Sequence, residues 1–241
     1  MYNLYTLYII LYTIAMGILY IIATPIGNLK DITLRALDIL KEVDFILCED
    51  TRQTAKLLNH YGISKPLISY FQHSKISKIE YIVNLLNQGK NLALVTDAGT
   101  PGISDPGNLL IEHITHNIKQ EEVKIVPIPG ASAVAAALSI SGFPADKFVF
   151  MGFPPHKKGR EKYFKEIADA KYTIVFYESV HRIVKALEQL KNILSEDRKI
   201  VICRELTKQF ETIYRGNIGE ILEKVKGDKI KGEFVVVLEA K

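Results

Sequence analysis

The sequence predicts an α/β protein of two domains, with a parallel sheet in the first domain and a mixed sheet in the second. Short β-rich runs alternate with amphipathic helical patterns along most of the 241 residues, and such alternation is typical of parallel sheets covered by helices on both faces. The last two strand-like runs flank only one short helical pattern, which favours antiparallel strands at one edge of the second sheet. The small-residue run 129–144 marks the junction, so we expect an apolar N-terminal extension over 1–16 and domains over 17–130 and 131–241.

The elements of the first domain follow from hydrophobic periodicity and from residues that begin or end helices. Asp31 is the expected N-cap of the first helix, which should bury one face. Gly62 is expected to end the second helix, because glycine tolerates the left-handed conformation found there. The buried face of the first helix is predicted to contain Leu34, Leu37, Leu40 and Val43. Strands are expected at 18–22, 44–48, 66–71, 91–95 and 123–128, with helices near 31–43, 51–62, 75–88 and 107–118.

The second domain repeats this β/α style. A helix is expected within 129–144, since small apolar residues there lie between two ends marked by glycine and proline. Further helices are expected near 159–169 and 180–193. Strands are expected at 147–153, 172–178, 199–205, 210–216 and 232–240.

Composition excludes several classes of protein. With 48% hydrophobic and 24% charged residues, the chain is globular rather than disordered. The net charge of +4 permits a nucleic-acid partner without requiring one. Cys48 and Cys203 both lie in apolar strand-like runs, so no disulfide framework is indicated and a cytoplasmic location is expected. The six histidines show no zinc-ligand spacing with cysteine, so no metal is expected.

The N-terminal run carries no charge from Met1 to Leu29 and is long enough to span a bilayer. It has no basic flank, and its Tyr and Thr residues are scattered through it. Residues 18–22, "ILYII", lead directly into the turn "ATPIGN" and fit a first buried strand. We therefore interpret 1–16 as an extension and expect no membrane association, with a membrane-touching or signal-like segment as the alternatives.

The most unusual stretch is "LVTDAGTPGISDPGN" over 94–108. In open α/β sheets, ligands bind beyond the carboxyl ends of the strands, and this loop follows such an end. Its glycines let backbone approach a ligand closely, and its prolines limit the entropy lost on binding. Asp97 and Asp105, without any lysine, would repel phosphate and tolerate a cation. The alternative is an ordinary rigid turn.

Two further runs follow strands of the first domain. "ATPIGNLKDIT" over 23–33 is a second tight turn, which together with the first loop suggests one site lined by both. "CEDTRQT" over 48–54 places Glu49, Asp50 and Arg52 on the same rim, where a carboxylate can act as a general base. The alternative is a solvated helix start in which Asp50 is the N-cap.

Charged runs also occur in the second domain. "FYESVHR" over 176–182 and "CRELTKQFE" over 203–211 each place acids and bases at the end of a strand. Glu178 can also be explained as a helix cap and His181 as an exposed helix residue. "HKKGREKYFK" over 156–165 combines five basic residues with two aromatic ones and fits contact with RNA phosphates. A solvated basic helix face explains the same run.

Read together, these motifs resemble one family. "TPIGNLKDITLRAL", "CEDTR", "DAGTPGISDPG", "IPGASAV", "FVFMGFPP", "FYESVHR", "CREL" and "GEFVVVLE" occur in this order between Ile18 and Glu239. The chain is similar to the tetrapyrrole methylase superfamily and, within it, to the branch that methylates bacterial 16S ribosomal RNA. The resemblance implies a homodimer and S-adenosylmethionine (SAM) in a cleft between two α/β domains. It also implies 2′-O-methylation of a decoding-centre cytidine. Members of this branch commonly carry a further helical segment after "GEFVVVLE", whereas this sequence ends at Lys241.

The implied reaction needs a proton acceptor, residues that contact RNA and a SAM-binding surface, and only the SAM-binding residues are carried over from the family by position. A ribose 2′-hydroxyl must lose its proton as it attacks a methyl group, so the site needs a proton acceptor. The candidates for this role, not ranked by the sequence, are Glu49, Asp50, Asp97 and Glu178. Candidates for RNA contact are Arg52, Lys157, Lys158, Arg160 and Arg204. The implied SAM-binding residues are Pro25, Ile26, Gly99, Thr100, Pro101, Ile103, Ala131, Ser132, Met151, Tyr177 and Leu206.

Three other functions remain as rivals. One is a methylase of the same superfamily that acts on a tetrapyrrole or on diphthamide, although "TPIGNL" with "EDTR" argues against it. A dinucleotide-dependent oxidoreductase is disfavoured because no G-x-G-x-x-G motif is present. A non-catalytic RNA-binding protein is disfavoured because it would not need the glycine-rich loops that follow the strands of this sequence.

Overall fold

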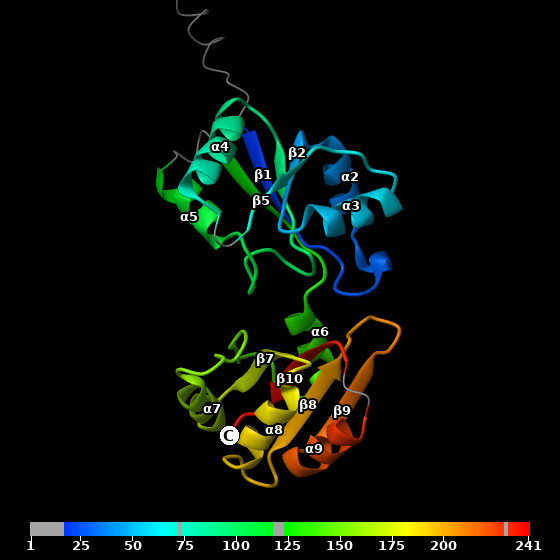
Figure 1. The fold of residues 1–241 in the computed structure, drawn as a ribbon, viewed down its shortest axis with the longest axis vertical. Coiled ribbons are helices and arrows are strands. Elements are labelled where there is room, and N and C mark those ends of the chain that lie inside the picture. The colour runs from blue at the N-terminus through cyan, green and yellow to red at the C-terminus, as the bar shows by residue number, and fades with distance from the viewer. Residues whose placement is uncertain (1–16, 72–73, 118–122, 229–230) are drawn as a thin grey trace, which may run out of the picture. The chain divides into compact units, whose positions relative to one another are not determined.

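The computed structural model describes residues 17–71, 74–117, 123–228 and 231–241. The predicted N-terminal extension lies outside these residues. The chain divides into two compact units (Figure 1). Unit 1 contains the described residues up to Pro25 together with Leu29–Ala131, and unit 2 contains Ile26–Asn28 and Ser132–Lys241. No helix within the described ranges is both long enough and apolar enough to cross a bilayer.

Unit 1 contains a five-stranded sheet in the order β3-β2-β4-β1-β5. Every neighbouring pair is parallel, which confirms the predicted parallel sheet. Figure 1 shows α2 and α3 on one side of the sheet and α4 and α5 on the other. The strands are β1 (Gly17–Ile22), β2 (Phe45–Cys48), β3 (Leu67–Ser69), β4 (Leu92–Leu94) and β5 (Val123–Ile128). The helices are η1 (Leu29–Asp31), α2 (Leu34–Glu42), α3 (Thr51–His60), α4 (Ile76–Asn87) and α5 (Asn108–Asn117).

Alternate residues of the unit 1 strands enter two cores, as the period of a strand requires. Leu47 and Leu92 pack with α4 and α5 on one face. Ile46 and Ala93 pack with α2 and α3 on the other. The continuous apolar strands of the sequence therefore reflect burial on both faces, and the polar residues gather where the strands end.

The start of α2 differs from the prediction. Its N-cap is Thr33, whose side chain accepts a hydrogen bond from the Ala36 N–H at 3.1 Å, whereas Asp31 lies in η1. Leu34 is 81% exposed. The core on this side contains Ala36, Leu40 and Val43 with Leu37 packed against it, so three of the four residues predicted for the buried face lie there and Leu34 does not.

Unit 2 contains a second five-stranded sheet, in the order β6-β7-β10-β8-β9. β6 and β7 are parallel and the other three pairs are antiparallel, so the predicted mixed sheet is confirmed. The position of the last strand was not expected: β10 lies at the centre, because its run "FVVVL" is buried on both faces. The strands are β6 (Phe148–Phe150), β7 (Thr173–Ser179), β8 (Lys199–Arg204), β9 (Thr212–Asn217) and β10 (Glu233–Leu238). The helices are α6 (Ala133–Ser141), α7 (Arg160–Ala168), α8 (Ile183–Lys191) and α9 (Ile218–Gly227).

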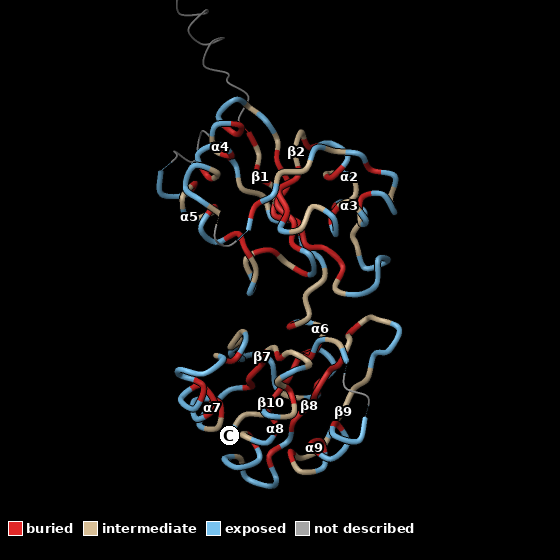
Figure 2. The backbone as a smooth tube through the Cα atoms, in the orientation of Figure 1, coloured by how far each residue is buried: buried red, intermediate tan, exposed pale blue. Residues whose placement is uncertain are grey.

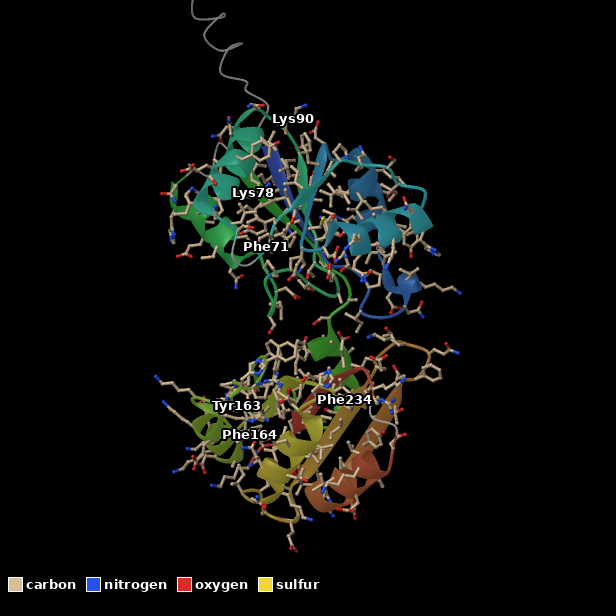
Figure 3. All side chains as sticks on the ribbon, in the orientation of Figure 1. Phe71, Lys78, Lys90, Tyr163, Phe164 and Phe234 are labelled. Carbon is tan, nitrogen blue, oxygen red and sulfur yellow. The ribbon has the colours of Figure 1, made fainter. Side chains whose placement is uncertain are left out.

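The unit 2 sheet also separates two cores. Phe234 and Val236 of β10 pack with α7, α8 and α9, whereas Val235 and Val237 pack with α6. Figure 2 shows the central strands β7, β8 and β10 largely buried, with exposed backbone concentrated in the connecting loops. Figure 3 labels Phe234 and, on α7, Tyr163 and Phe164, which belong to the same core.

Candidate functional site

Three acidic residues meet at the carboxyl ends of two neighbouring strands. Glu49 and Asp50 follow β2, and Asp97 lies three residues beyond β4, which pairs with β2 in parallel. The Asp97 carboxylate accepts a hydrogen bond from the Asp50 backbone N–H. The structure therefore brings together three of the four predicted proton acceptors, because parallel neighbours end at the same edge of a sheet.

The pKa values of the three carboxyl groups in this acidic cluster are shifted in different directions. Partial burial, together with the charges of Asp97 and Asp50, raises the pKa of Glu49. Partial burial also raises the pKa of Asp97. The hydrogen bond from the Asp50 backbone lowers this pKa in part, and the negative charge of Asp50 raises it further. Hydrogen bonds from Arg52 lower the pKa of Asp50 to about 2. Glu49 and Asp97 are thus the better proton acceptors, because their pKa values move toward neutral pH.

Asp50 and Arg52 have structural partners in each other. Arg52 Nη2 lies 2.7 Å from Asp50 Oδ2, and Arg52 Nε lies 3.1 Å from Oδ1. Asp50 is also the N-cap of α3, through the Arg52 backbone N–H at 2.8 Å. The Arg52 side chain is nevertheless 85% exposed, so its guanidinium retains donors for a phosphate or a ribose.

The loops after β1, β4 and β5 are joined beside the acidic cluster. Thr24, after β1, exchanges two backbone hydrogen bonds with Gly99, whose φ is +86°. The Thr24 hydroxyl donates to the Thr96 carbonyl oxygen at 2.9 Å. The Thr100 hydroxyl donates to the Ala131 carbonyl oxygen at 3.2 Å, which attaches the loop after β5. These bonds bring together the unit 1 candidates for SAM binding, which are Pro25, Gly99, Thr100, Pro101, Ile103 and Ala131.

Glycine is required within the loop itself. Gly102 has a φ of +84°, and a Cβ built there would lie 2.8 Å from Asn108 Oδ1. A Cβ on Gly107 would lie 3.2 Å from the Leu94 side chain. Any larger residue at these positions would strain the loop or push it from the sheet, so the glycines of the sequence have a steric reason.

The chemistry of this loop fits SAM. Residues 96–107 contain two aspartates and no lysine or arginine, which suits a sulfonium cation and not a phosphate. The Thr96 hydroxyl is buried and has no hydrogen-bond partner within the described residues. Such an unsatisfied group is expected where a polar ligand completes the bonding.

Unit 2 contains a second set of candidates, of which Met151 packs against the core formed with α7, α8 and α9, whereas the apolar others lie on the α6 side of the sheet. Ile26, Tyr177 and Leu206 belong to the core that packs against α6. The Tyr177 ring packs edge-on against Phe150 at a centroid distance of 4.9 Å, and the Met151 N–H donates to the Val175 carbonyl oxygen at 2.8 Å. Ser132 is the N-cap of α6. The aromatic ring and aliphatic side chains on the α6 side suit the adenine and methionine parts of SAM.

Gly27 explains how the short segment Ile26–Asn28 is held within unit 2. A Cβ on Gly27 would lie 2.4 Å from Lys208 Cγ and 2.8 Å from the Leu206 carbonyl oxygen. The opposing loop contains Glu205 and Thr207 at φ values of +52° and +66°. Two non-glycine residues in this strained region are the kind of departure that accompanies functional loops.

The structure corrects two expectations for Glu178, that it accepts a proton and that it caps a helix. Its side chain is 0% exposed and lies between Arg182 Nε at 3.0 Å and Arg160 Nη2 at 3.4 Å. It is therefore not placed as an open proton acceptor, and it does not cap α8, whose N-cap is Arg182. His181 is exposed but precedes the helix. Arg182, which the sequence analysis did not single out, lies closer to Glu178 than Arg160 does.

The expected RNA contacts divide into exposed and buried residues. Lys157 and Lys158 are exposed. Arg160 is only 5% exposed and Arg204 8%. Arg204 donates to the Lys231 carbonyl oxygen at 2.8 Å and to Asp228 at 3.1 Å. The prediction that Arg160 and Arg204 contact phosphate directly is therefore wrong for this structure, since both guanidiniums are committed to internal partners.

The remaining sequence candidates offer no other chemistry. Cys48 and Cys203 are buried, and burial raises the pKa of both thiols, to about 11 for Cys203. Neither is poised as a nucleophile. No group of His, Cys, Asp and Glu side chains within the described ranges is arranged to hold a metal ion.

The chain belongs to the tetrapyrrole (corrin/porphyrin) methylase family, which it matches over residues 18–222. It is 46% identical to ribosomal RNA small subunit methyltransferase I of Haemophilus influenzae, over 93% of this chain and 79% of that protein. It is 44% identical to the protein of the same name from Thermotoga maritima, over 94% of this chain and 100% of that one. Among solved structures, the methyltransferase CobJ aligns with a TM-score of 0.67 at 18% identity, covering 93% of this chain and 94% of that one. The cobalamin biosynthetic enzyme cobalt precorrin-4 methyltransferase aligns with a TM-score of 0.62 at 19% identity, covering 92% and 94%. At these identities the structural likeness supports the fold.

Proposed function

We propose that this chain transfers the methyl group of SAM to the 2′-hydroxyl of a cytidine in 16S ribosomal RNA. Family membership supports methyl transfer, and relatives at 44–46% identity carry the name of a ribosomal RNA small subunit methyltransferase. The observation on which the proposal chiefly rests is the acidic cluster of Glu49, Asp50 and Asp97 beside the glycine-rich loop. This arrangement combines a proton acceptor with a surface that tolerates a cation.

SAM, when bound, supplies an electrophilic methyl group on its sulfonium. The N–H and carbonyl of Gly99 are already bonded to Thr24, so Gly99 would allow close approach of SAM, whereas Thr100 and Ala131 would offer backbone groups to its polar parts. The unit 2 candidates Tyr177, Met151 and Leu206 would offer apolar surface. Pro25, Ile26, Pro101, Ile103 and Ser132 complete the proposed set of binding residues.

Proton removal falls to Glu49 or Asp97. A 2′-hydroxyl is a weak nucleophile until a base accepts its proton, and carboxylates with raised pKa values are suited to that task. Asp50 is a poor acceptor because Arg52 holds its pKa at about 2. Asp50 instead orients Arg52, whose exposed guanidinium would bind a phosphate of the substrate.

The quaternary structure is a further part of the proposal. By resemblance to its branch of the family, the chain is expected to form a homodimer with a largely apolar interface. Light scattering at micromolar concentration tests this directly. A monomeric mass would contradict the dimer while leaving the assignment of the reaction intact.

The reaction is tested with SAM carrying an isotopically labelled methyl group. The protein is incubated in parallel with immature small ribosomal subunits, protein-free 16S RNA and uroporphyrinogen III, and the RNA is then digested to nucleosides. Labelled 2′-O-methylcytidine is the expected product. Label in the tetrapyrrole would support the rival methylase, and RNA binding without any label would support a non-catalytic RNA-binding protein.

A further inference from the structure

The segment Pro154–Gly159, "PPHKKG", connects β6 to α7 and exposes Lys157 and Lys158. We call it the lysine loop. Its first two residues are prolines, which have no N–H and contribute only carbonyl oxygens to hydrogen bonding. The lysine loop therefore depends on donors from elsewhere in unit 2 to hold its start in place.

Two arginines supply these donors, one for each proline. Arg182 Nη1 donates to the Pro154 carbonyl oxygen at 3.0 Å. Arg160 Nη1 donates to the Pro155 carbonyl oxygen at 3.1 Å. Both arginines follow the loop in sequence but come from different elements, since Arg160 begins α7 and Arg182 precedes α8.

One carboxylate holds both arginines. Glu178 Oε1 lies 3.0 Å from Arg182 Nε, and Oε2 lies 3.4 Å from Arg160 Nη2. The Ser179 backbone N–H also donates to Oε1 at 2.8 Å. With both oxygens occupied and a side chain that is 0% exposed, Glu178 has no face open to a substrate.

The arginines are fixed by further contacts. Arg160 Nε donates to Gln189 Oε1 on α8 at 2.8 Å, and its guanidinium lies 4.9 Å from the centre of the Phe164 ring. Arg182 Nε also lies 3.2 Å from Ser179 Oγ. The network thus joins β7, α7 and α8 to the lysine loop, and its two guanidiniums and one carboxylate leave a net positive charge at the start of that loop.

We propose that Glu178 is a positioning residue for RNA binding: through Arg160 and Arg182 it orders the lysine loop, so that Lys157 and Lys158 meet the phosphates of the RNA. The inference rests on the proposed function, because it needs a polyanionic substrate. It gives Glu178 a role in substrate binding in place of proton transfer. Removing the carboxylate would leave two cations buried without a counter-charge, and the start of the loop would be released.

The test compares Glu178→Gln with the parent protein and with the control Glu188→Gln. Glu188 is a matched control because it also forms an ion pair within unit 2, with Lys226 at 2.8 Å, but its side chain is 48% exposed and it does not contact the lysine loop. Limited digestion with trypsin reports the order of the loop, since the protease cuts after Lys157 and Lys158. Binding of 16S RNA, SAM affinity and the steady-state constants are measured on the same preparations.

We expect Glu178→Gln to be cut after Lys157 and Lys158 faster than the parent, and Glu188→Gln to be cut at the parental rate. RNA affinity should fall by about tenfold, the effect of losing one charge-assisted contact, and the KM for small subunits should rise in step. The kcat and the SAM affinity should stay near the parental values. A fall in kcat with an intact loop and parental RNA affinity would overturn the proposal and would indicate that Glu178 acts in the methyl-transfer step.

A second variant, Arg182→Lys, tests the same proposal if Glu178→Gln fails to fold. Lysine keeps the positive charge but has no planar fork, so it cannot hold Glu178 and the Pro154 carbonyl together. Arg182 is 19% exposed, so the change is milder, and faster cleavage of the loop with weaker RNA binding is again expected. Parental behaviour in both assays would refute the proposal. If the parent itself fails to bind or methylate RNA, the proposed function falls with the RNA-binding role, whereas the digestion still reports whether Glu178 orders the loop.

Discussion

The backbones of Thr24 and Gly99 exchange two hydrogen bonds, with N···O distances of 2.9 and 3.0 Å, and so join the turn after β1 to the loop after β4. Seventy-five residues separate the two in sequence. Gly99 makes this contact at a backbone φ of +86°, which residues other than glycine rarely adopt. The candidate SAM loop therefore depends on the absence of a side chain at one position.

Replacing Gly99 with valine should abolish SAM binding while unit 1 stays folded. A β-branched residue strains the backbone at this φ by roughly 1–3 kcal/mol and adds bulk where the backbone would meet the ligand. Calorimetric titration with SAM measures the loss. Gly62→Val is the matched control, because Gly62 has a φ of +66° in open space and lies outside the loop. Equal SAM affinity in both variants would show that the site lies elsewhere.

Glu49→Gln should reduce methyl transfer by about 10²–10⁴-fold if Glu49 accepts the proton of the 2′-hydroxyl. Asp97→Asn makes the corresponding test for the second candidate. Single-turnover rates with saturating SAM and RNA isolate this step from binding. If both variants retain the parental rate, proton removal does not depend on this acidic cluster.

The pH profile offers a separate test of the same cluster. A carboxylate accepts a proton only when it is ionised, so the rate should rise with pH through a value above the ordinary pKa of 4.5 of a glutamate. Asp50→Asn removes one negative neighbour of both Glu49 and Asp97. The pKa of each should then fall, and the rising limb of the profile should move to lower pH. A shift to higher pH would contradict the arrangement of charges.

Thr33→Ala should destabilise the protein by about 1 kcal/mol, because it removes the side-chain cap of α2. Asp31→Ala, at the position that the sequence alone suggested, should cost distinctly less, since Asp31 lies in η1 and does not cap the helix. Urea unfolding of the two variants measures the difference. A larger loss for Asp31→Ala would place the cap at Asp31 after all.

Neutralising Lys157 and Lys158 together should weaken RNA binding and make it less sensitive to salt. Each lost phosphate contact lowers the slope of log K against log salt by roughly 0.7 to 0.9. Lys185→Gln with Lys191→Gln removes the same charge from α8 and serves as the control. Titrations of 16S RNA at several salt concentrations distinguish an RNA-binding loop from a solvated basic surface. Equal slopes for parent and Lys157/Lys158 variant would mean that the loop is a solvated surface.

Local sequence determined the layered architecture and the position of the acidic cluster. The alternation of strands and helices was sufficient for a parallel sheet in unit 1, and glycine, proline and aspartate marked the loop after β4. Glu49 and Asp97 were predicted to lie on one rim because each follows a buried strand of a parallel sheet. That inference needs only the rule that parallel neighbours end at one edge of the sheet. It uses no knowledge of individual side-chain contacts.

Tertiary structure alone decided the roles of Arg160, Glu178 and Arg204. In sequence each resembles an exposed charge at the end of a strand or the start of a helix. Arg160 and Glu178 are 18 residues apart, and Arg204 reaches the Lys231 carbonyl across 27 residues. Whether a charge faces solvent or a buried partner depends on such long-range contacts, which hydrophobic periodicity does not encode. The central place of β10 has the same cause, because strand order is set by which faces the folded chain covers and not by the order of the strands in sequence.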